Sequence, residues 1–213
     1  MKTDELISAL ARDPTPPPTR PASLRVAVAT VLGLVIAAAF VAFGPGVRED
    51  ILNSEGRMPA MMKAMFSAGF VAAAMPLLLR LARPGRPVGW RILAAGGFGA
   101  LAALVAVVTL AGADPGQRME LWIDGMFPWC LITIPALAAP VAALLAFVLR
   151  DLAPTRLTQS GAALGAVSGG IGAMAYAMYC PIDSMVFVTV WYALAIAMCA
   201  AAGALLGSRL LRW

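Results

Sequence analysis

Long apolar runs are the feature that most restricts how this chain can fold. Five runs of about 20 apolar residues, and a sixth interrupted by Lys63, occupy most of the 213 residues. Each run is long enough to cross a hydrocarbon layer about 30 Å thick as a helix. Charged residues make up only 13% of the chain, well below the share usual in a soluble domain. The sequence therefore predicts an all-α, polytopic membrane bundle of six transmembrane helices.

The predicted spans are joined by short connections, which leave no room for a soluble catalytic domain. They cover residues 24–43, 60–80, 92–111, 126–149, 160–179 and 186–207. The chain then divides into a cytoplasmic arm with a Pro-rich linker, residues 1–23, and a transmembrane domain, residues 24–213. No cleavable signal peptide is indicated, because the first apolar run begins late and lacks a small-residue cleavage site before polar sequence. We expect the first span to stay as an anchor.

The distribution of basic residues predicts that both termini lie in the cytoplasm, since Lys and Arg accumulate on the cytoplasmic side of short loops. With the N-terminus inside, twelve of the sixteen basic residues fall on the inner side. The outer side holds the other four and seven of the eleven acids: Arg48, Arg57, Lys63, Arg118, Glu49, Asp50, Glu55, Asp114, Glu120, Asp124 and Asp183. This topology and contact with the headgroups of membrane lipid account for the net charge of +5, so no direct contact with nucleic acid is expected.

The stretch MKTDELISALARD is the part outside the predicted membrane that is best suited to bind a partner. Thr3 can cap a short helix whose first turn carries Asp4 and Glu5 near the positive end of the helix dipole. The apolar residues then fall on one face: Leu6, Ile7 and Leu10. About ten residues are too few for a stable isolated helix in water, where roughly 12 to 15 are needed. Such a helix requires a partner to stabilise it.

A proline run, PTPPPTRP, follows this stretch and favours a polyproline II linker. One interpretation is that the arm is a helix-in-groove ligand that folds as it binds a cytoplasmic protein. Two alternatives stay open. The segment is either a frayed terminus or a helix that lies on the lipid surface.

Three cysteines occur at two predicted depths. Cys130, in MFPWCLITIPALAAP, lies in the first outer turns of the fourth span, and Cys180, in YAMYCPIDSM, lies at the outer end of the fifth. These two thiols could form a disulfide or together bind a soft metal ion, and coincidence is the third interpretation. Cys199 lies about 20 Å into the sixth span, at 1.5 Å per residue, and is expected to be a packing residue.

Other polar and aromatic residues are interpreted as architecture. Lys63 is expected to extend to the outer surface rather than to mark an ion path. Trp191 and Tyr192 are assigned to an interfacial aromatic belt, a few residues deeper than usual. The small residues in SGAALGAVSGGIGAMA predict close helix packing in the fifth span.

The residues that are missing argue against catalysis. The chain has no histidine, which is the commonest general base. It also has no phosphate-binding glycine motif and no CxxC pair. We therefore expect no enzymatic activity and no cofactor. A small-molecule or ion transporter is the main alternative function, although no span carries a buried carboxylate pair suited to ion relay. A purely structural membrane subunit is the third.

Four segments together resemble one family. MKTDELISALARD, PWCLITIPALAAP, YCPIDSMVFVTVWYALAI and the closing RLLRW occur in the order found in NrsF-type negative regulators of sigma factor, which are bacterial six-span anti-sigma proteins. The resemblance covers nearly the whole chain. One departure is Asp183, at a position where glutamate is expected.

This resemblance implies a function and a location. It implies that the N-terminal arm sequesters an extracytoplasmic-function sigma factor at the bacterial inner membrane. It also implies that paired cysteines, here Cys130 and Cys180, respond to oxidant or heavy metal so that the sigma factor is released. Cys199 matches no motif of the family.

Overall fold

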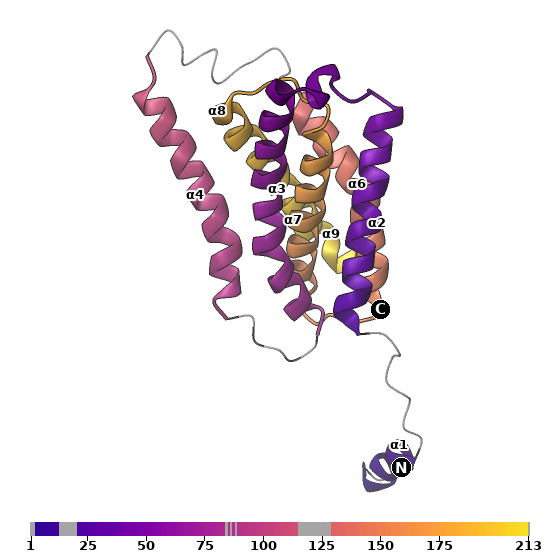
Figure 1. Cartoon of the computed structure of the whole chain (residues 1–213). Coiled ribbons are helices and arrows are strands. Elements are labelled where there is room, and N and C mark those ends of the chain that lie inside the picture. Colours follow the sequence, from indigo (N-terminus) through magenta and orange to yellow (C-terminus); the bar gives the residue numbers. More distant parts are fainter. Residues whose placement is uncertain are drawn as a thin grey trace.

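The structure, a computed structural model, describes residues 3–12, 21–114 except 84, 86 and 88, and 129–212. Every regular element in these ranges is helical, as predicted (Figure 1). The long helices run side by side as a bundle, and the chain passes repeatedly from one end of it to the other. The elements are α1 Thr3–Arg12, α2 Ala22–Phe43, η1 Glu49–Leu52, α3 Ser54–Leu81, α4 Arg91–Gly112, α6 Trp129–Arg150, α7 Leu157–Tyr176, α8 Met185–Phe187, η2 Val188–Tyr192 and α9 Ala193–Leu210.

Local sequence explains where the first long helix begins and ends. Pro21 precedes α2 in an extended conformation and lacks the backbone N–H that a helix start leaves unpaired. The helix ends at Gly44 and Pro45, because proline disfavours a helical conformation in the residue before it. All six predicted spans correspond to long helices, although the start of the fourth, residues 126–128, lies outside the described residues.

Five helical segments among the described residues are long and apolar enough to cross a membrane. They are α2, α3, α4, α6 and the continuous segment Met185–Leu210, which joins α8, η2 and α9. The remaining long helix, α7, is rich in glycine, alanine and serine and is not among these five. The six-span topology and the cytoplasmic placement of both termini stay predictions.

Helix α7 occupies the centre of the bundle. Most of its residues are buried, and it packs against α2, α3, α6 and α9. A helix surrounded by protein does not have to offer an apolar surface to lipid, which explains why its composition is less apolar than that of its neighbours. The small residues predicted to allow close packing are used in this way.

The contact between α7 and α9 depends on glycine. A Cβ atom added to Gly165 would lie 2.1 Å from the backbone oxygen of Cys199, and one added to Gly161 would lie 2.0 Å from the backbone oxygen of Gly203. A Cβ on Gly169 would lie 2.9 Å from the Cβ of Cys199. Cys199 therefore packs against the glycine face of α7, which agrees with its predicted role.

Helix α4 lies at the edge of the bundle and diverges from it toward one end (Figure 1). Its main attachment is a cluster of aromatic rings shared with α3. The rings of Phe70 and Phe98 meet edge to face, with centroids 4.9 Å apart, and Phe66 lies against both. Gly69 leaves the space for this cluster, because a Cβ there would lie 2.3 Å from the Phe98 ring.

The last helical segment contains a π-helical turn at Val188–Tyr192. Such turns insert an extra residue into a helix and rotate the side chains that follow. Tyr192 is fully buried and belongs to the core, where its ring lies 5.8 Å from that of Tyr176. Its predicted place in an interfacial belt is therefore wrong, because its ring packs against Tyr176 of α7 inside the bundle.

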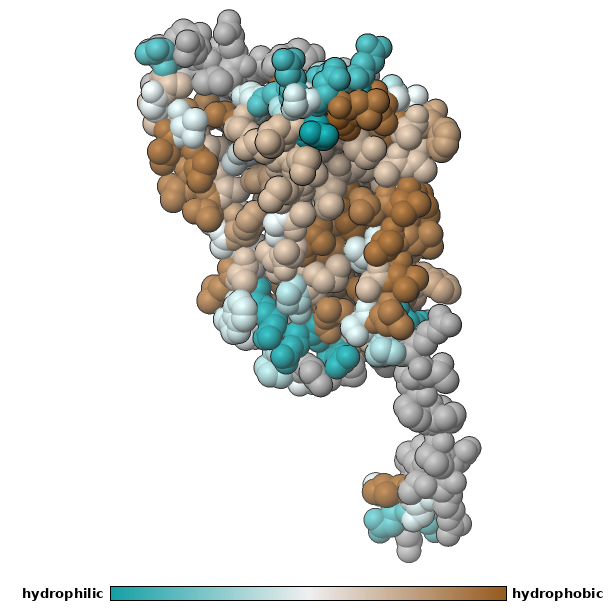
Figure 2. All heavy atoms as spheres, in the orientation of Figure 1, coloured by the Kyte–Doolittle hydropathy of each residue, from teal (hydrophilic) through white to brown (hydrophobic). Residues whose placement is uncertain are grey.

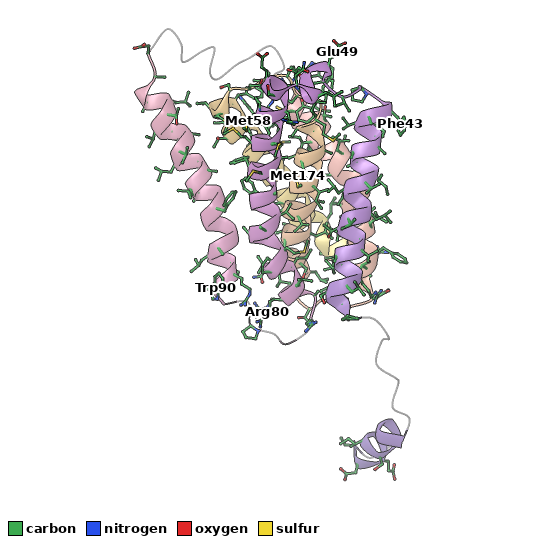
Figure 3. All side chains as sticks on the ribbon, in the orientation of Figure 1. Phe43, Glu49, Met58, Arg80, Trp90 and Met174 are labelled. Carbon is green, nitrogen blue, oxygen red and sulfur yellow. The ribbon has the colours of Figure 1, made fainter. Side chains whose placement is uncertain are left out.

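On the face shown in Figure 2, an apolar belt lies between two hydrophilic edges. Charged and aromatic side chains gather at these edges, with Glu49 at one and Arg80 and Trp90 at the other (Figure 3). The belt includes many exposed apolar side chains on α2 and α4, among them Val35, Phe40, Leu104 and Val108. Exposure of this extent is typical of a surface that faces lipid.

Candidate functional site

Cys130 and Cys180 lie at the same end of the bundle, which we call the thiol end. Cys130 is the second residue of α6, and Cys180 lies in the non-helical segment that follows α7. Both are free thiols with 0% of their surface exposed. They are close enough to interact electrostatically. The structure thus brings together the two cysteines that the sequence assigned to one depth.

Two tyrosines complete this buried group. Tyr176 and Tyr192 are also 0% exposed, and both interact electrostatically with Cys130 and Cys180. The Tyr192 hydroxyl interacts with the Cys180 sulfur, yet neither tyrosine hydroxyl has a hydrogen-bond partner of ordinary geometry among the described residues. Buried hydroxyls without a partner are uncommon and costly. The thiols therefore share their buried surroundings with two tyrosine hydroxyl groups.

A buried lysine holds the backbone of Cys180. Lys63 of α3 is 1% exposed, and its Nζ atom donates hydrogen bonds of 2.8 Å to the Cys180 carbonyl oxygen and 2.8 Å to Oδ1 of Asp183. An ammonium group away from water requires such partners. The segment between α7 and α8 is thus attached to α3 at the residue that carries the thiol.

Arg48 holds the same segment, between α7 and α8, from a different part of the chain. Arg48 lies between α2 and η1, and its guanidinium donates to the Cys180 carbonyl oxygen at 3.2 Å and to Asp183 at 2.9 and 3.2 Å. It also contacts both carboxylate oxygens of Asp50, at 2.5 and 2.6 Å. Its backbone N–H donates to the carbonyl oxygen of Met178 at 3.1 Å. We call Arg48, Asp50, Lys63 and Asp183 the ion cluster.

The charges of the ion cluster stabilise one another. Hydrogen bonds to Asp50 and then to Asp183 raise the pKa of Arg48 above its usual range. The pKa of Asp183 is lowered. Its partial burial acts to raise this pKa, but the hydrogen bonds from Arg48 and Lys63 lower it by more. The hydrogen bond from Arg48 likewise lowers the pKa of Asp50. Arg48, Asp50 and Asp183 are therefore charged at neutral pH, and the Arg48 guanidinium faces both carboxylates.

Glycine allows the cluster to form at the start of α3. A Cβ added to Gly56 would lie 2.4 Å from the carboxylate carbon of Asp50 and 2.6 Å from its backbone oxygen. Without a side chain at this position, η1 packs directly on the first turns of α3. This contact places Asp50 where Arg48 can bind it and Asp183 together.

The predicted extension of Lys63 to the surface is wrong. Its side chain is buried because Asp183 and the Cys180 carbonyl oxygen supply partners inside the protein. The sequence carried one signal for this, namely a lone cation in an otherwise apolar run, which by default marks a functional site. Its partner lies 120 positions away and could not be identified from spacing.

The metal-binding interpretation of the two thiols receives limited geometric support. Among the described residues, no group of three or more His, Cys, Asp or Glu side chains is arranged to hold a metal ion. Two thiolates suit a soft cation of low coordination number better than they suit a four-coordinate one. Asp124, which the sequence placed at a similar level, lies outside the described residues.

The predicted N-terminal helix is present as α1, Thr3–Arg12. Thr3 already belongs to the helix, and Thr3, Asp4, Glu5 and Ile7 are exposed, with Ile7 at 59%. Leu6 and Leu10 are part of α1, but their side chains lie outside what the structure describes. The predicted polyproline II linker falls at residues 13–20, which also lie outside the described residues.

Comparison with known proteins identifies the family. Residues 10–213 match the family described as NrsF, negative regulator of sigma F. The chain belongs to the NrsF family. It is 33% identical over 214 residues to a probable anti-sigma-F factor NrsF from Azospira oryzae, and 33% identical over 222 residues to the anti-sigma-F factor NrsF from Caulobacter vibrioides. Both alignments cover the whole of each chain.

This membership confirms the resemblance seen in the sequence. Members of the NrsF family are regulators of a sigma factor, which agrees with the expectation that this chain is not an enzyme. No solved structure matches the chain.

Proposed function

We propose that this NrsF-family protein is a membrane-embedded anti-sigma factor that holds an extracytoplasmic-function sigma factor through its N-terminal arm. In this proposal the bundle lies in the inner membrane with both termini in the cytoplasm and with six spans, α7 included. The buried thiols then lie near the periplasmic side of the membrane, and the sigma factor is released when they react with oxidant or heavy metal. Family membership and the contacts of Cys180 with the ion cluster are the observations that support this function most directly.

The arm has the properties of a peptide ligand. Ile7 is exposed on a helix of ten residues, which is shorter than an isolated helix needs for stability in water. An exposed apolar side chain on such a helix gains stability when it enters a groove of a partner. We infer that Leu6, Ile7 and Leu10 form the contact face, while Thr3, Asp4 and Glu5 stabilise the start of the helix.

Two reactions at the thiols are compatible with their burial and proximity. In the first, Cys130 and Cys180 form a disulfide, and the two protons and two electrons that they lose reduce a peroxide to two water molecules. In the second, each thiol releases its proton and the two thiolates bind one soft cation. Either product replaces two separate buried thiols by one bonded unit with a different geometry.

The ion cluster offers a route from the thiols to the arm. Arg48 lies in the short connection after α2, and α2 follows directly after the arm and linker. Because Arg48 contacts both the carbonyl oxygen of Cys180 and the side chain of Asp183, movement of the thiol segment changes the position of the end of α2. If this contact of Arg48 has two states, and the sigma factor binds the arm more tightly in one of them, a reaction at the thiols changes binding at the arm. A coupling of about 1 to 3 kcal/mol changes that affinity roughly 5 to 150-fold.

The arm is tested by co-purification of sigma factor F with the full chain and with single substitutions in α1. Ile7→Asp places a charge on the proposed contact face, and Ser8→Asp places the same charge on the opposite face as the matched control. We expect Ile7→Asp to lose the sigma factor and Ser8→Asp to retain it. Equal recovery by both variants would contradict the role of the arm.

The thiols are tested by release of the bound sigma factor under peroxide and, separately, under a soft metal ion. Cys130→Ser and Cys180→Ser are expected to hold the sigma factor under both treatments, whereas the control Cys199→Ser releases it as the wild type does. Release by all three variants would remove the sensor role. A response to only one of the two treatments decides between the disulfide and the metal ion.

The coupling route is tested at Arg48 with intact cysteines. Arg48→Gln removes the contacts with Asp183 and Asp50, and Arg57→Gln removes an exposed arginine at the same end of the bundle. We expect Arg48→Gln to change sigma factor binding even without oxidant or metal, because the segment after α2 is no longer held to Cys180 and Asp183. If Arg48→Gln and Arg57→Gln both behave as wild type, the signal does not pass through the ion cluster.

A further inference from the structure

Three arginines line a hollow at the end of the bundle opposite the thiols, which we call the arginine end. The hollow has a volume of about 250 Å³ and is formed where α2, α3 and α4 meet. It is lined by Ser23, Pro76, Leu79, Arg80, Arg83 and Arg91. Arg80 and Arg91 are half-buried and Arg83 is exposed. These cations come from three separate segments, the last turn of α3, the connection after it and the first residue of α4.

Among the described residues, no acidic side chain lines this hollow. Within the same part of the chain, Arg80 and Arg83 form no ion pair, and Arg91 lies over the ring of Trp90, 5.2 Å from its centroid. The nearby cation on α2, Arg25, is bound by Asp151 instead. Three guanidinium groups without a carboxylate create a positive potential that favours an anion.

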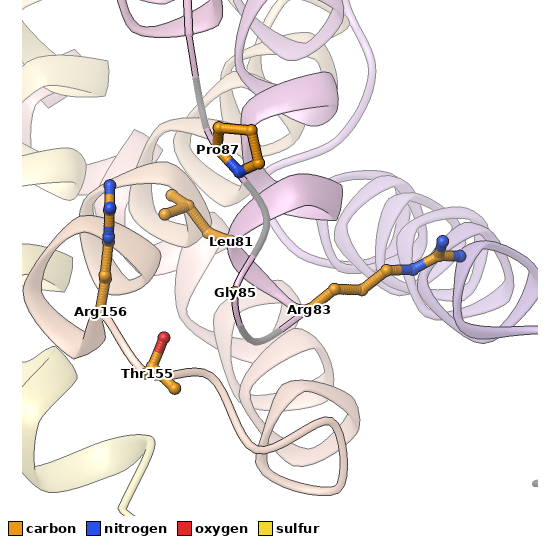
Figure 4. Close-up of a pocket in the computed structure, with 6 residues that line it drawn as sticks. All are labelled: Leu81, Arg83, Gly85, Pro87, Thr155 and Arg156. Carbon is orange, nitrogen blue, oxygen red and sulfur yellow. The ribbon is translucent and has the colours of Figure 1, made fainter.

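A neighbouring hollow of about 280 Å³ does not have this property. It is lined in part by Arg83 and Arg156, but Figure 4 shows that these two side chains extend away from each other. Their guanidinium groups cannot bind one ligand together. The hollow between α2, α3 and α4 differs in being lined by three arginines, which come from three separate segments.

The position of the hollow indicates the kind of anion. One of its lining residues, Arg80, lies with Trp90 at one end of the bundle (Figure 3), where Figure 2 shows a hydrophilic edge next to apolar surface. Trp90 is 67% exposed, as is typical of an aromatic residue at the level of lipid headgroups. Pro76 and Leu79 extend the lining of the hollow toward the apolar belt. A ligand with a phosphate at the edge and hydrocarbon beside it matches both parts.

We propose that Arg80, Arg83 and Arg91 bind the phosphate group of an anionic phospholipid. The planar guanidinium groups donate paired hydrogen bonds to the phosphate oxygens. The Ser23 hydroxyl is a further donor, and the acyl chains lie along the apolar surface beside Pro76 and Leu79. This site is independent of the orientation of the protein, because both leaflets present phosphates at this level. It is also independent of the thiols and of the proposed sigma factor contact.

The experiment titrates the detergent-solubilised full chain with dioleoylphosphatidylglycerol or dioleoylphosphatidylcholine and counts bound lipids by native mass spectrometry. Arg80→Gln/Arg91→Gln removes two charges from the hollow. Arg209→Gln/Arg212→Gln removes two charges from the same end of the bundle, at the C-terminus (Figure 1), and is the matched control. We expect wild type and control to retain one phosphatidylglycerol, and the first variant to bind it about tenfold or more weakly.

Equal affinity of all three proteins for phosphatidylglycerol, or equal binding of phosphatidylcholine by wild type, would overturn the proposal. Displacement of the lipid by excess inorganic phosphate would assign the site to a free anion and would also overturn it. A variant that keeps the lipid but loses sigma factor F would show a protein-binding surface instead. If Arg80→Gln/Arg91→Gln does not fold, Arg80→Lys/Arg91→Lys decides. It keeps the charge but loses the paired geometry, so weaker binding supports the site and unchanged binding contradicts it.

Discussion

The two ends of the bundle use their charged side chains in opposite ways. At the thiol end, Arg48 and Lys63 are almost completely buried and are bound by Asp50 and Asp183. At the arginine end, Arg80 and Arg83 line an open hollow and, within the described residues, have no acidic partner. Paired charges inside a protein fix the geometry of the segments that carry them, whereas unpaired charges at its surface remain available to external anions. The first end is suited to transmit a local change, and the second is suited to bind lipid.

The largest effect is expected when the pairing at the thiol end is broken. Asp183→Ala leaves the buried ammonium of Lys63 with the Cys180 carbonyl oxygen as its remaining hydrogen-bond partner, and we expect a loss of about 3 kcal/mol in the free energy of unfolding. The double variant Asp183→Ala/Lys63→Met removes the uncompensated charge and is expected to recover a large part of that loss. Denaturant unfolding in detergent measures both. A double variant that is less stable than Asp183→Ala would show that the pair is not the source of the effect.

A smaller effect is expected from acid, and it should originate at the same end. Because the pKa values of Asp50 and Asp183 are lowered in the folded protein, their stabilisation is present above the unfolded carboxyl pKa of about 4 and is lost as pH falls below it. The free energy of unfolding is therefore expected to decrease between about pH 4 and pH 2. Asp183→Asn should flatten this dependence, whereas Glu55→Gln, at the start of α3, should preserve the wild-type slope. Identical slopes for the two variants would contradict this origin.

The smallest effect on stability is expected at the arginine end. Arg80→Gln removes a cation that has no ion pair among the described residues, so the free energy of unfolding in lipid-free detergent should change by less than about 0.5 kcal/mol. Lys63→Gln is the matched substitution at the thiol end and should cost more, because it removes a buried partner of Asp183 and of Cys180. If both variants lose the same free energy of unfolding, the charged side chains at the two ends do not differ in their contribution to stability.

Part of the fold and of the candidate site could be predicted from residue type and order. The apolar runs gave the positions of all the long helices, and counting along them placed Cys130 and Cys180 at one end and Cys199 apart from them. The acidic first turn and the apolar residues that follow it were sufficient to predict the short helix α1. Such features depend on neighbours in sequence and on the cost of placing polar groups in hydrocarbon.

Other features were decided only by tertiary structure. They include the pairing of Lys63 and Arg48 with Asp183 and the burial of Tyr192 beside the thiols. They also include the hollow that Arg80 and Arg91 line together. All of these depend on how each helix is rotated about its axis. When a helix is apolar on every side, its sequence does not show which face meets another helix and which meets lipid. Glycine contacts such as that of Gly165 with α9 fix these rotations, because close packing allows only a few arrangements of the helices.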